Sequence, residues 1–249
     1  MIKNILRSGL KYFLDLAGYK VTNKNQFGTD ILLDLKLLFK SRESLVLFDI
    51  GANLGQTTEE YSIYFPNSVI YSFEPEPDTF LRLKESMKNR KNVKFFNVGF
   101  GAKQEAIQMN VNKGSGGNSI LAVSDQITSY ATGDWTEKVS EKKVEITTIN
   151  NFCEKESINA IDLIKIDTQG YELKIIEGGD RIFTPSCTKA IFIEVLFVEL
   201  YKEQSYFSDI FKILTSRGFK FVGLYNEFQK TESPYFLLWC DALFVSESI

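Results

Sequence analysis

Residues 45–56, with the sequence LVLFDIGANLGQ, constrain the fold of this chain more than any other segment. An apolar run typical of a buried strand closes at Asp49 and Ile50, and a glycine-containing turn then leads into a helical pattern. A second strand-like run, Val69–Phe73, is followed directly by Glu74. A strand, a glycine-bearing turn, a helix and an acid closing the next strand form the mononucleotide half of a doubly wound α/β sheet. The rest of the chain is therefore expected to complete such a sheet.

Apolar patterns downstream predict further strands alternating with helices, as a parallel sheet requires. We expect strands over residues 93–98, 161–166 and 190–196, helices over 55–64, 77–90, 171–178 and 205–216, and a final antiparallel pair over 220–224 and 238–245. The alternation breaks between two further strand-like runs, 105–111 and 143–149, which bracket a long polar and glycine-rich segment. Because long loops inside compact domains are usually functional or mobile, we interpret this part as a β-hairpin insertion with a lid.

The first 42 residues are predicted to be a helical extension of the domain formed by residues 43–249. Met1–Ala17 has apolar residues at helical spacing and Lys3, Arg7 and Lys11 on another face, and Thr29–Lys40 predicts a second helix. The first helix is too short and too interrupted to span a bilayer. It either docks on the domain or on a partner subunit of a homo-oligomer, or it rests on an anionic membrane surface as a basic amphipathic helix.

The composition excludes several function classes. A net charge of −3 and a pI near 5.3 provide no basic field for nucleic acid. The three cysteines are widely spaced and form no CxxC pair, which indicates reduced thiols and a cytoplasmic location, with peripheral contact at the inner face of the membrane if the first helix binds lipid. Because the chain has no histidine, proton transfer must fall to Asp, Glu, Lys or Tyr, and any metal must be held by oxygen ligands.

The turn after the first strand does not fit a dinucleotide. A GxGxxG turn needs glycine where this chain has Asn53, so a nucleoside carrying an amino-acid tail is a better match. In this interpretation Asp49 accepts from an ammonium group, Gly51 allows the turn, and the helix that opens at Gly55 and Gln56 meets a carboxylate. Glu74 is placed to accept from both ribose hydroxyls. The alternative is a turn that only joins a strand to a helix.

Several motifs resemble the FkbM family of S-adenosylmethionine-dependent methyltransferases. They are FDIGANLGQ, the strand end at Phe73-Glu74-Pro75, Asn97-Val98-Gly99, Gly117-Asn118-Ser119, the run IKIDTQGYE over residues 164–172, and Ile193-Glu194-Val195. The resemblance covers roughly residues 45–225. It implies a class I methyltransferase (Rossmann-like) fold, with a seven-stranded, mostly parallel sheet covered by helices on both faces. It also implies S-adenosylmethionine as cofactor and transfer to a hydroxyl oxygen. One departure is visible, because the family usually has Thr-Leu-Asp where this chain reads Thr148-Ile149-Asn150.

The resemblance also implies roles for individual residues. The cofactor-binding set is Asp49, Gly51, Asn53, Gly55, Gln56, Glu74, Pro75, Asn97 and Gly99. Asn97 can pair with an adenine edge or can simply be a turn residue at a strand end. From the lid, Asn118 and Ser119 are candidates to contact the acceptor, and Glu172 is a further substrate-binding candidate that can instead complement the dipole of its helix.

The candidate catalytic residues lie at the carboxyl ends of two neighbouring strands. Asp167 is the first candidate for orienting or deprotonating the acceptor hydroxyl, with Lys165 as a weaker one and Glu194 joining from the next strand. As an alternative, Asp167 caps the helix that follows it. Two carboxylates at adjacent strand ends can also hold Mg²⁺, but we expect no metal site.

The sequence therefore predicts an S-adenosylmethionine-dependent O-methyltransferase. Its expected acceptor is the hydroxyl of a small molecule or saccharide, in bacterial glycan or secondary-metabolite biosynthesis. The rival interpretation is a non-catalytic Rossmann-like binding or assembly module.

Overall fold

The computed structural model describes residues 14, 27–127, 130, 133–230 and 235–249. The expected helix over residues 1–17 lies almost entirely outside this part, so its docking partner stays a prediction. None of the helices within the described ranges is long and apolar enough to cross a membrane.

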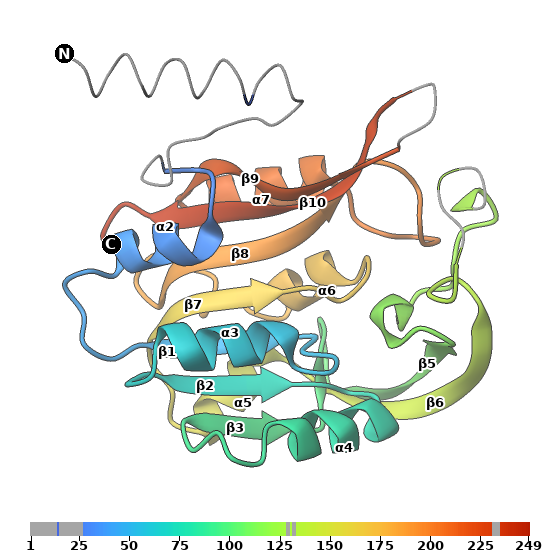
Figure 1. The fold of residues 1–249 in the computed structure, drawn as a ribbon, viewed down its shortest axis with the longest axis horizontal. Helices are drawn as coiled ribbons and strands as arrows, with labels where there is room; N and C mark the ends of the chain where they lie inside the picture. Colours follow the sequence, from blue (N-terminus) through green and yellow to red (C-terminus); the bar gives the residue numbers. More distant parts are fainter. Residues whose placement is uncertain (1–13, 15–26, 128–129, 131–132, 231–234) are drawn as a thin grey trace.

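A seven-stranded sheet forms the centre of the molecule, with the order β3-β2-β1-β7-β8-β10-β9 (Figure 1). Its strands are β1 Val46–Ile50, β2 Val69–Phe73, β3 Val93–Phe96, β7 Ile161–Ile166, β8 Thr188–Leu196, β9 Phe219–Gln229 and β10 Leu237–Ser246. The first five in spatial order are parallel, and β10 runs antiparallel to both β8 and β9. The sheet order reverses beside β1, so the carboxyl ends of β1 and β7 flank the switch point where such sheets bind ligands. The expected class I methyltransferase fold is confirmed.

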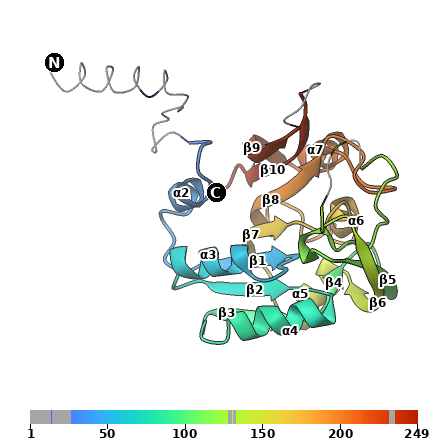
Figure 2. The ribbon, with the colours of Figure 1, turned by 45° about the vertical axis from the view of Figure 1, so that its right-hand side comes forward.

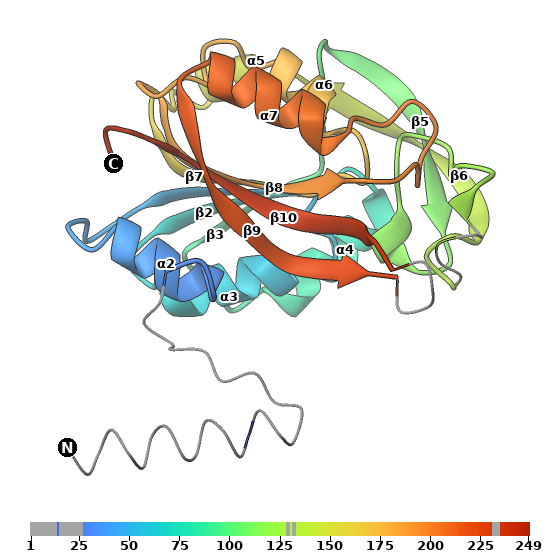
Figure 3. The ribbon, with the colours of Figure 1, turned by 90° about the horizontal axis from the view of Figure 1, so that it is seen from above.

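Helices cover both faces of this sheet (Figure 3). One face carries α2 Ile31–Leu38, α3 Gln56–Tyr64 and α4 Pro77–Ser86, and the other carries α5 Ile149–Lys155, α6 Glu172–Glu177 and α7 Phe207–Ser216. The pleat of β1 divides its side chains between the two layers, since Leu47 belongs to the core that contains Leu35 of α2, while Phe48 belongs to the core on the other face and contacts Phe152 of α5.

The helix α2 is fixed to the domain by both its cap and its buried face. Asp30 caps it by accepting from the Leu32 and Leu33 amides, at 3.0 and 3.1 Å. The buried Asp34 carboxylate accepts from the Tyr225 hydroxyl at 2.9 Å, which ties the helix to β9. The division at residue 42 remains a prediction, but α2 shares a hydrophobic core with the sheet.

The expected hairpin insertion is present as part of a second, three-stranded sheet with the order β4-β6-β5. Its strands are β4 Gly99–Phe100, β5 Glu105–Asn112 and β6 Lys138–Thr147, and β5 pairs antiparallel with β6. Figure 2 shows this sheet beside the carboxyl ends of the parallel strands. Between β5 and β6 the short 3-10 helix η1, Ser115–Gly117, sits over the same end. The insertion therefore roofs the switch point.

One predicted strand ends early, and a helix that the sequence analysis did not predict follows it. The strand predicted over 143–149 ends at Thr147, and α5 begins at Ile149, because the Thr148 side chain accepts from the Asn151 amide at 3.1 Å and caps a new helix. Asn150, at the position where the family usually has an acid, accepts from the Ile182 amide at 3.3 Å and donates to Asp180. This residue therefore joins α5 to the 180–182 segment.

Candidate active site

A cleft lies at the switch point, between the loops that follow β1, β2 and β7 and the roof formed by η1. We call it the first cavity. Seven of the residues predicted from the sequence line it, namely Gly51, Asn53, Glu74, Pro75, Gly99, Asn118 and Asp167.

The loops after β1 and β7 touch through Gly51. This residue has φ +79°, and a Cβ built on it would lie 1.9 Å from the Asp167 carbonyl oxygen, so only glycine fits between the two loops. Two residues later, Asn53 also adopts a positive φ of 50°, a region that asparagine tolerates better than most residues. Its Oδ1 is buried at the first cavity without a hydrogen-bond partner. A buried acceptor of this kind is a ready partner for a ligand donor.

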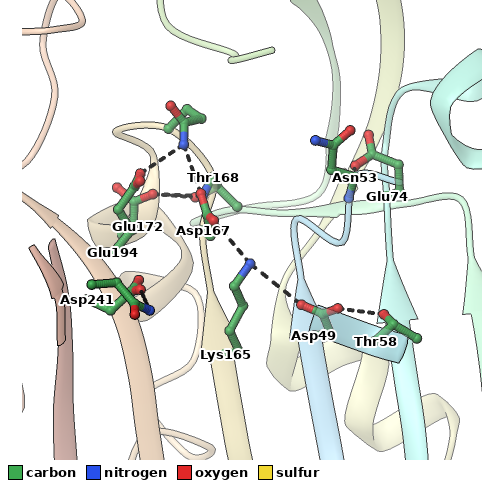
Figure 4. Close-up of polar contacts among 12 residues, drawn as sticks. Asp49, Asn53, Thr58, Glu74, Lys165, Asp167, Thr168, Glu172, Glu194 and Asp241 are labelled. Carbon is green, nitrogen blue, oxygen red and sulfur yellow. Dashed lines mark hydrogen bonds and ion pairs between the residues drawn. The ribbon is translucent and has the colours of Figure 1, made fainter. Parts of the chain in front are cut away.

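Glu74 lies across the first cavity from the β7 loop, and both its carboxylate oxygens are fixed by backbone donors. Oε2 accepts from the Asn53 amide at 2.9 Å (Figure 4). Oε1 accepts from the Glu76 amide, also at 2.9 Å. Only 5% of the residue is exposed, and burial raises the pKa of this carboxyl to about 7 despite the two amide donors, with Glu76 and Asp49 adding to the rise. The remaining lone pairs of an oriented carboxylate suit the two hydroxyls of a ribose.

Asp49 is completely buried and does not line the first cavity. Its Oδ2 accepts from the Thr58 hydroxyl of α3 at 2.5 Å, and its Oδ1 lies 3.7 Å from the Lys165 ammonium (Figure 4). Gly55, with φ +97°, stands at the start of α3 and packs on Leu83, and Gln56 is exposed beside it. None of these three predicted residues lines the first cavity.

Asn97 holds the adjoining loop. Its Nδ2 donates to the carbonyl oxygens of Glu74 and Pro75, at 2.8 and 2.9 Å. Both amide hydrogens are therefore used to position the two residues that line the first cavity, while Gly99 contributes its backbone to the wall.

Lys165 joins the β1 and β7 carboxylates beneath the first cavity. Its buried ammonium lies 3.2 Å from Asp167 Oδ2 and 3.7 Å from Asp49 Oδ1. Burial alone would lower the pKa of this lysine, but Asp167, Asp49 and Asp241 outweigh it and raise the pKa above its usual value. Lys165 therefore stays a cation that fixes the Asp167 carboxylate from below.

Gln169 connects the two predicted catalytic acids. Its Nε2 donates to Asp167 Oδ1 at 2.8 Å and to Glu194 Oε2 at 3.0 Å, and its Oε1 accepts from the Tyr201 hydroxyl at 2.6 Å. Ser119 of the insertion donates to the Gln169 carbonyl oxygen at 2.7 Å. The Ser119 hydroxyl thus locks the roof to the β7 loop, whereas its neighbour Asn118 lines the first cavity.

Two further carboxylates, those of Glu172 and Asp241, lie near Asp167 and Glu194. Glu172 lies under the loop and accepts from the Thr168 amide and hydroxyl, at 2.8 and 3.0 Å, so it holds the Asp167–Gly170 turn. Asp241 of β10 pairs in register with Glu194. Burial first, and the neighbouring carboxylates second, raise the pKa of Glu194 well above its usual value, that of Glu172 to about 7 and that of Asp241 to about 6.

A second cavity adjoins the first. It is lined by Gly116, Trp135, Gln169, Glu194, Leu196, Leu200 and Trp239, and it shares Gly116 and Gln169 with the first cavity. Asp167 therefore lines one cavity and Glu194 the other, and the Gln169 amide lies between the two carboxylates. This arrangement can bring a group held in the first cavity against a hydroxyl held in the second, with a carboxylate on each side.

Sequence reasoning missed Gln169, Thr58 and Asp241 as parts of this site. Gln169 stands inside the IKIDTQGYE run, but a glutamine carries no titratable group to single it out. The sequence does contain a signal for Asp241. An acidic residue inside the apolar run Leu238–Val245 is as unusual as Glu194 inside its own strand, and it could have been predicted as a site residue for the same reason.

Across the described residues, no group of three or more acidic or cysteine side chains is arranged to hold a metal ion. Asp167 Oδ1 and Glu194 Oε2 both accept from the Gln169 amide. A Mg²⁺ ion bound between these two oxygens would have to replace that amide. The expectation on metal stays a prediction.

Comparison with known proteins identifies the relatives of this chain. A family model described as the methyltransferase FkbM domain matches residues 49–221. The 2-O-methyltransferase NoeI of Sinorhizobium fredii is 27% identical over 178 residues, covering 69% of this chain and 71% of that protein. The hexuronic acid methyltransferase AglP of Haloferax volcanii is 28% identical over 145 residues, covering 57% and 53%. Among solved structures, a precorrin-6y C5,15-methyltransferase from Geobacter metallireducens superposes with a TM-score of 0.48 at 13% identity, covering 92% of this chain and 95% of that one.

Proposed function

The chain belongs to the methyltransferase FkbM domain family, and on this premise we propose that it transfers a methyl group from S-adenosylmethionine to a hydroxyl oxygen of a saccharide. The observation that carries the proposal is the shared wall of the two cavities, where the Gln169 amide joins Asp167 to Glu194. The names of two relatives, a 2-O-methyltransferase and a hexuronic acid methyltransferase, support a saccharide acceptor.

The first cavity fits the cofactor in the chemistry of its donor set. The oriented Glu74 carboxylate would accept from the ribose hydroxyls, and the partnerless Asn53 Oδ1 would accept from a further donor. The apolar wall that includes Phe73, Pro75 and Val98 would hold the adenine. When bound, S-adenosylmethionine supplies an electrophilic methyl group on a positively charged sulfur.

The acceptor hydroxyl must lose its proton as its oxygen takes the methyl group. Glu194 lines the second cavity, and the Gln169 amide that donates to its Oε2 holds the carboxylate in place to accept that proton. In this proposal Glu194 accepts from the reacting hydroxyl and takes its proton, and Asp167, held by Lys165, keeps the Gln169 amide in place against Glu194. In the alternative assignment the two carboxylates exchange these roles.

Calorimetry and a turnover assay test the proposal together. The purified chain should bind S-adenosylmethionine, and release of S-adenosylhomocysteine should be observed with at least one member of a panel of methyl glycosides. Glu194→Gln should lower turnover roughly 100-fold or more while leaving cofactor affinity within about threefold, and Asp167→Asn should lower turnover by a similar factor. Asp125→Asn, which alters an exposed pair with Lys202, is the matched control and should leave both unchanged.

Two results would contradict this proposal. If neither cofactor binding nor turnover is detected, the methyltransferase assignment fails. Cofactor binding without turnover on any hydroxyl would instead favour the rival interpretation as a binding module. The cytoplasmic location remains part of the proposal and is consistent with three unpaired cysteines.

A further inference from the structure

The second cavity has one polar side and one apolar side. Glu194 and Gln169 form the polar side, and the other large side chains that line it are Trp135, Trp239, Leu196 and Leu200. A sugar ring has the same division, because its hydroxyls project around the edge while one face carries C–H groups that pack on aromatic rings. The cavity volume of about 330 Å³ is within the range of small-ligand sites.

The two tryptophans are the only ones in the chain, and both line this cavity. Trp135 comes from the insertion and Trp239 from β10, and their ring centroids lie 5.9 Å apart at 68°. Phe228 stacks on Trp239 with centroids 4.0 Å apart and an 11° interplanar angle, so the indole is held in place from one side. A rigid aromatic wall of this kind provides contact area at a small cost in conformational entropy.

Acidic groups outnumber basic ones around the cavity. Glu194 lines it, Asp167 is joined to Glu194 through the Gln169 amide, and Asp241 pairs with Glu194 in the strand register. Within the described part of the chain, neither cavity has a lysine or arginine in its lining, and the nearby cation Lys165 is already shared by Asp167 and Asp49.

We propose that the second cavity is the acceptor site and that it takes a saccharide ring without negative charge, a neutral or amino sugar, stacked against Trp239 and Trp135. An anionic acceptor such as a uronate would enter a site that holds several carboxylates and whose described lining contains no lysine or arginine, and like charges at short range oppose binding. This inference rests on the proposed function, since it names the substrate class of the same site.

Tryptophan fluorescence tests the inference directly, because both reporters lie in the proposed site. The full-length protein is titrated with methyl glucoside, methyl galactoside and methyl mannoside, each against its matched uronate and, for glucose, its 2-amino analogue. Every titration is run with and without S-adenosylhomocysteine. We expect at least one neutral or amino glycoside to change the fluorescence saturably and to bind roughly tenfold or more tightly than its uronate.

Variants separate stacking from charge. Trp239→Ala should weaken the preferred glycoside roughly tenfold, and Trp239→Phe should restore part of that loss. Glu194→Gln should reduce the ratio between the affinity for the neutral or amino glycoside and the affinity for its uronate, since it removes the carboxylate that lines the cavity. Leu81→Ala, at an exposed position on α4 outside both cavities, should change neither quantity. Calorimetry with S-adenosylhomocysteine shows that each variant is folded.

A uronate that binds as tightly as its neutral partner would overturn the inference, and so would a fluorescence signal that no glycoside changes. Either result is compatible with normal turnover on another acceptor, which would leave the proposed function standing. Failure of S-adenosylhomocysteine to bind would instead contradict the proposed function, while the sugar titrations without it would still decide the charge preference.

Discussion

Cofactor affinity should depend on pH through Glu74. This carboxyl is 5% exposed, and burial raises its pKa to about 7. If the ionised carboxylate is the form that accepts from the ribose hydroxyls, then affinity falls as the pH falls through 7. A group with this pKa is about one-eleventh ionised at pH 6 and about ten-elevenths ionised at pH 8, which corresponds to a roughly tenfold weaker apparent affinity at pH 6.

Replacing Glu74 by Gln should remove both the charge and the pH dependence. A glutamine can still accept with one oxygen, but it cannot accept from both hydroxyls while also accepting from both backbone amides that now hold it. Hydrogen bonds to charged groups contribute about 1.5–3 kcal/mol, so the dissociation constant at pH 8 should rise roughly 10- to 100-fold.

Isothermal titration with S-adenosylmethionine at pH 6, 7 and 8 measures both effects. Glu85→Gln, at an exposed position on α4, serves as the control and should follow the wild type at every pH. Titration of the ligand itself is common to all three proteins and cancels in the comparison. The assignment of Glu74 is refuted if Glu74→Gln binds as tightly as the wild type, or if it keeps the same dependence on pH.

Two further predictions concern stability. Lys165→Met should lower the free energy of unfolding by about 3–5 kcal/mol, because it leaves Asp49 and Asp167 without their shared cation, whereas Lys202→Met at an exposed pair should change it by less than about 1 kcal/mol. Urea denaturation measures both variants, and a loss below about 1 kcal/mol for Lys165→Met would contradict the role given to that ion pair. The ligand-free protein should also be more stable at pH 6 than at pH 8, since burial raises the pKa of Glu74 and Glu172 to about 7 in the folded state, above the unfolded value. Their contribution is fully present below about pH 4.5 and is lost as the pH rises through 7, by about 1 kcal/mol for each group between pH 6 and pH 8. A urea midpoint that does not decrease between these pH values would contradict this prediction.

The sheet and the ends of its strands were predictable because they depend on local pattern. Apolar runs that close at Asp49, Glu74 and Asp167 place those residues at one edge, whatever the details of packing. The start of α5 was not predictable in the same way. The strand-like pattern before it continues to Ile149, and only the cap formed by the Thr148 side chain ends the strand.

The division of labour among the site residues depends on contacts between distant segments. Asp49 stands at a strand end as expected, but its side chain is enclosed by Thr58 of α3 and Lys165 of β7. Asp241 approaches Glu194 only through the antiparallel register of β10 on β8, which the sequence does not specify. Gln169 lies between Asp167 and Glu194 in a turn where its own backbone adopts φ +57°, a conformation that the sequence pattern does not indicate for a glutamine.

Part of the wall of the second cavity comes from segments that do not line the first, and this has a consequence for how the enzyme can change over evolutionary time. Leu200 belongs to the segment after β8 and Trp239 to β10, while the residues proposed to hold the cofactor follow β1 and β2. Substitutions in these two segments can therefore reshape the acceptor wall without disturbing the cofactor loops. A single scaffold with this layout can diversify toward many acceptors while its methyl donor stays the same.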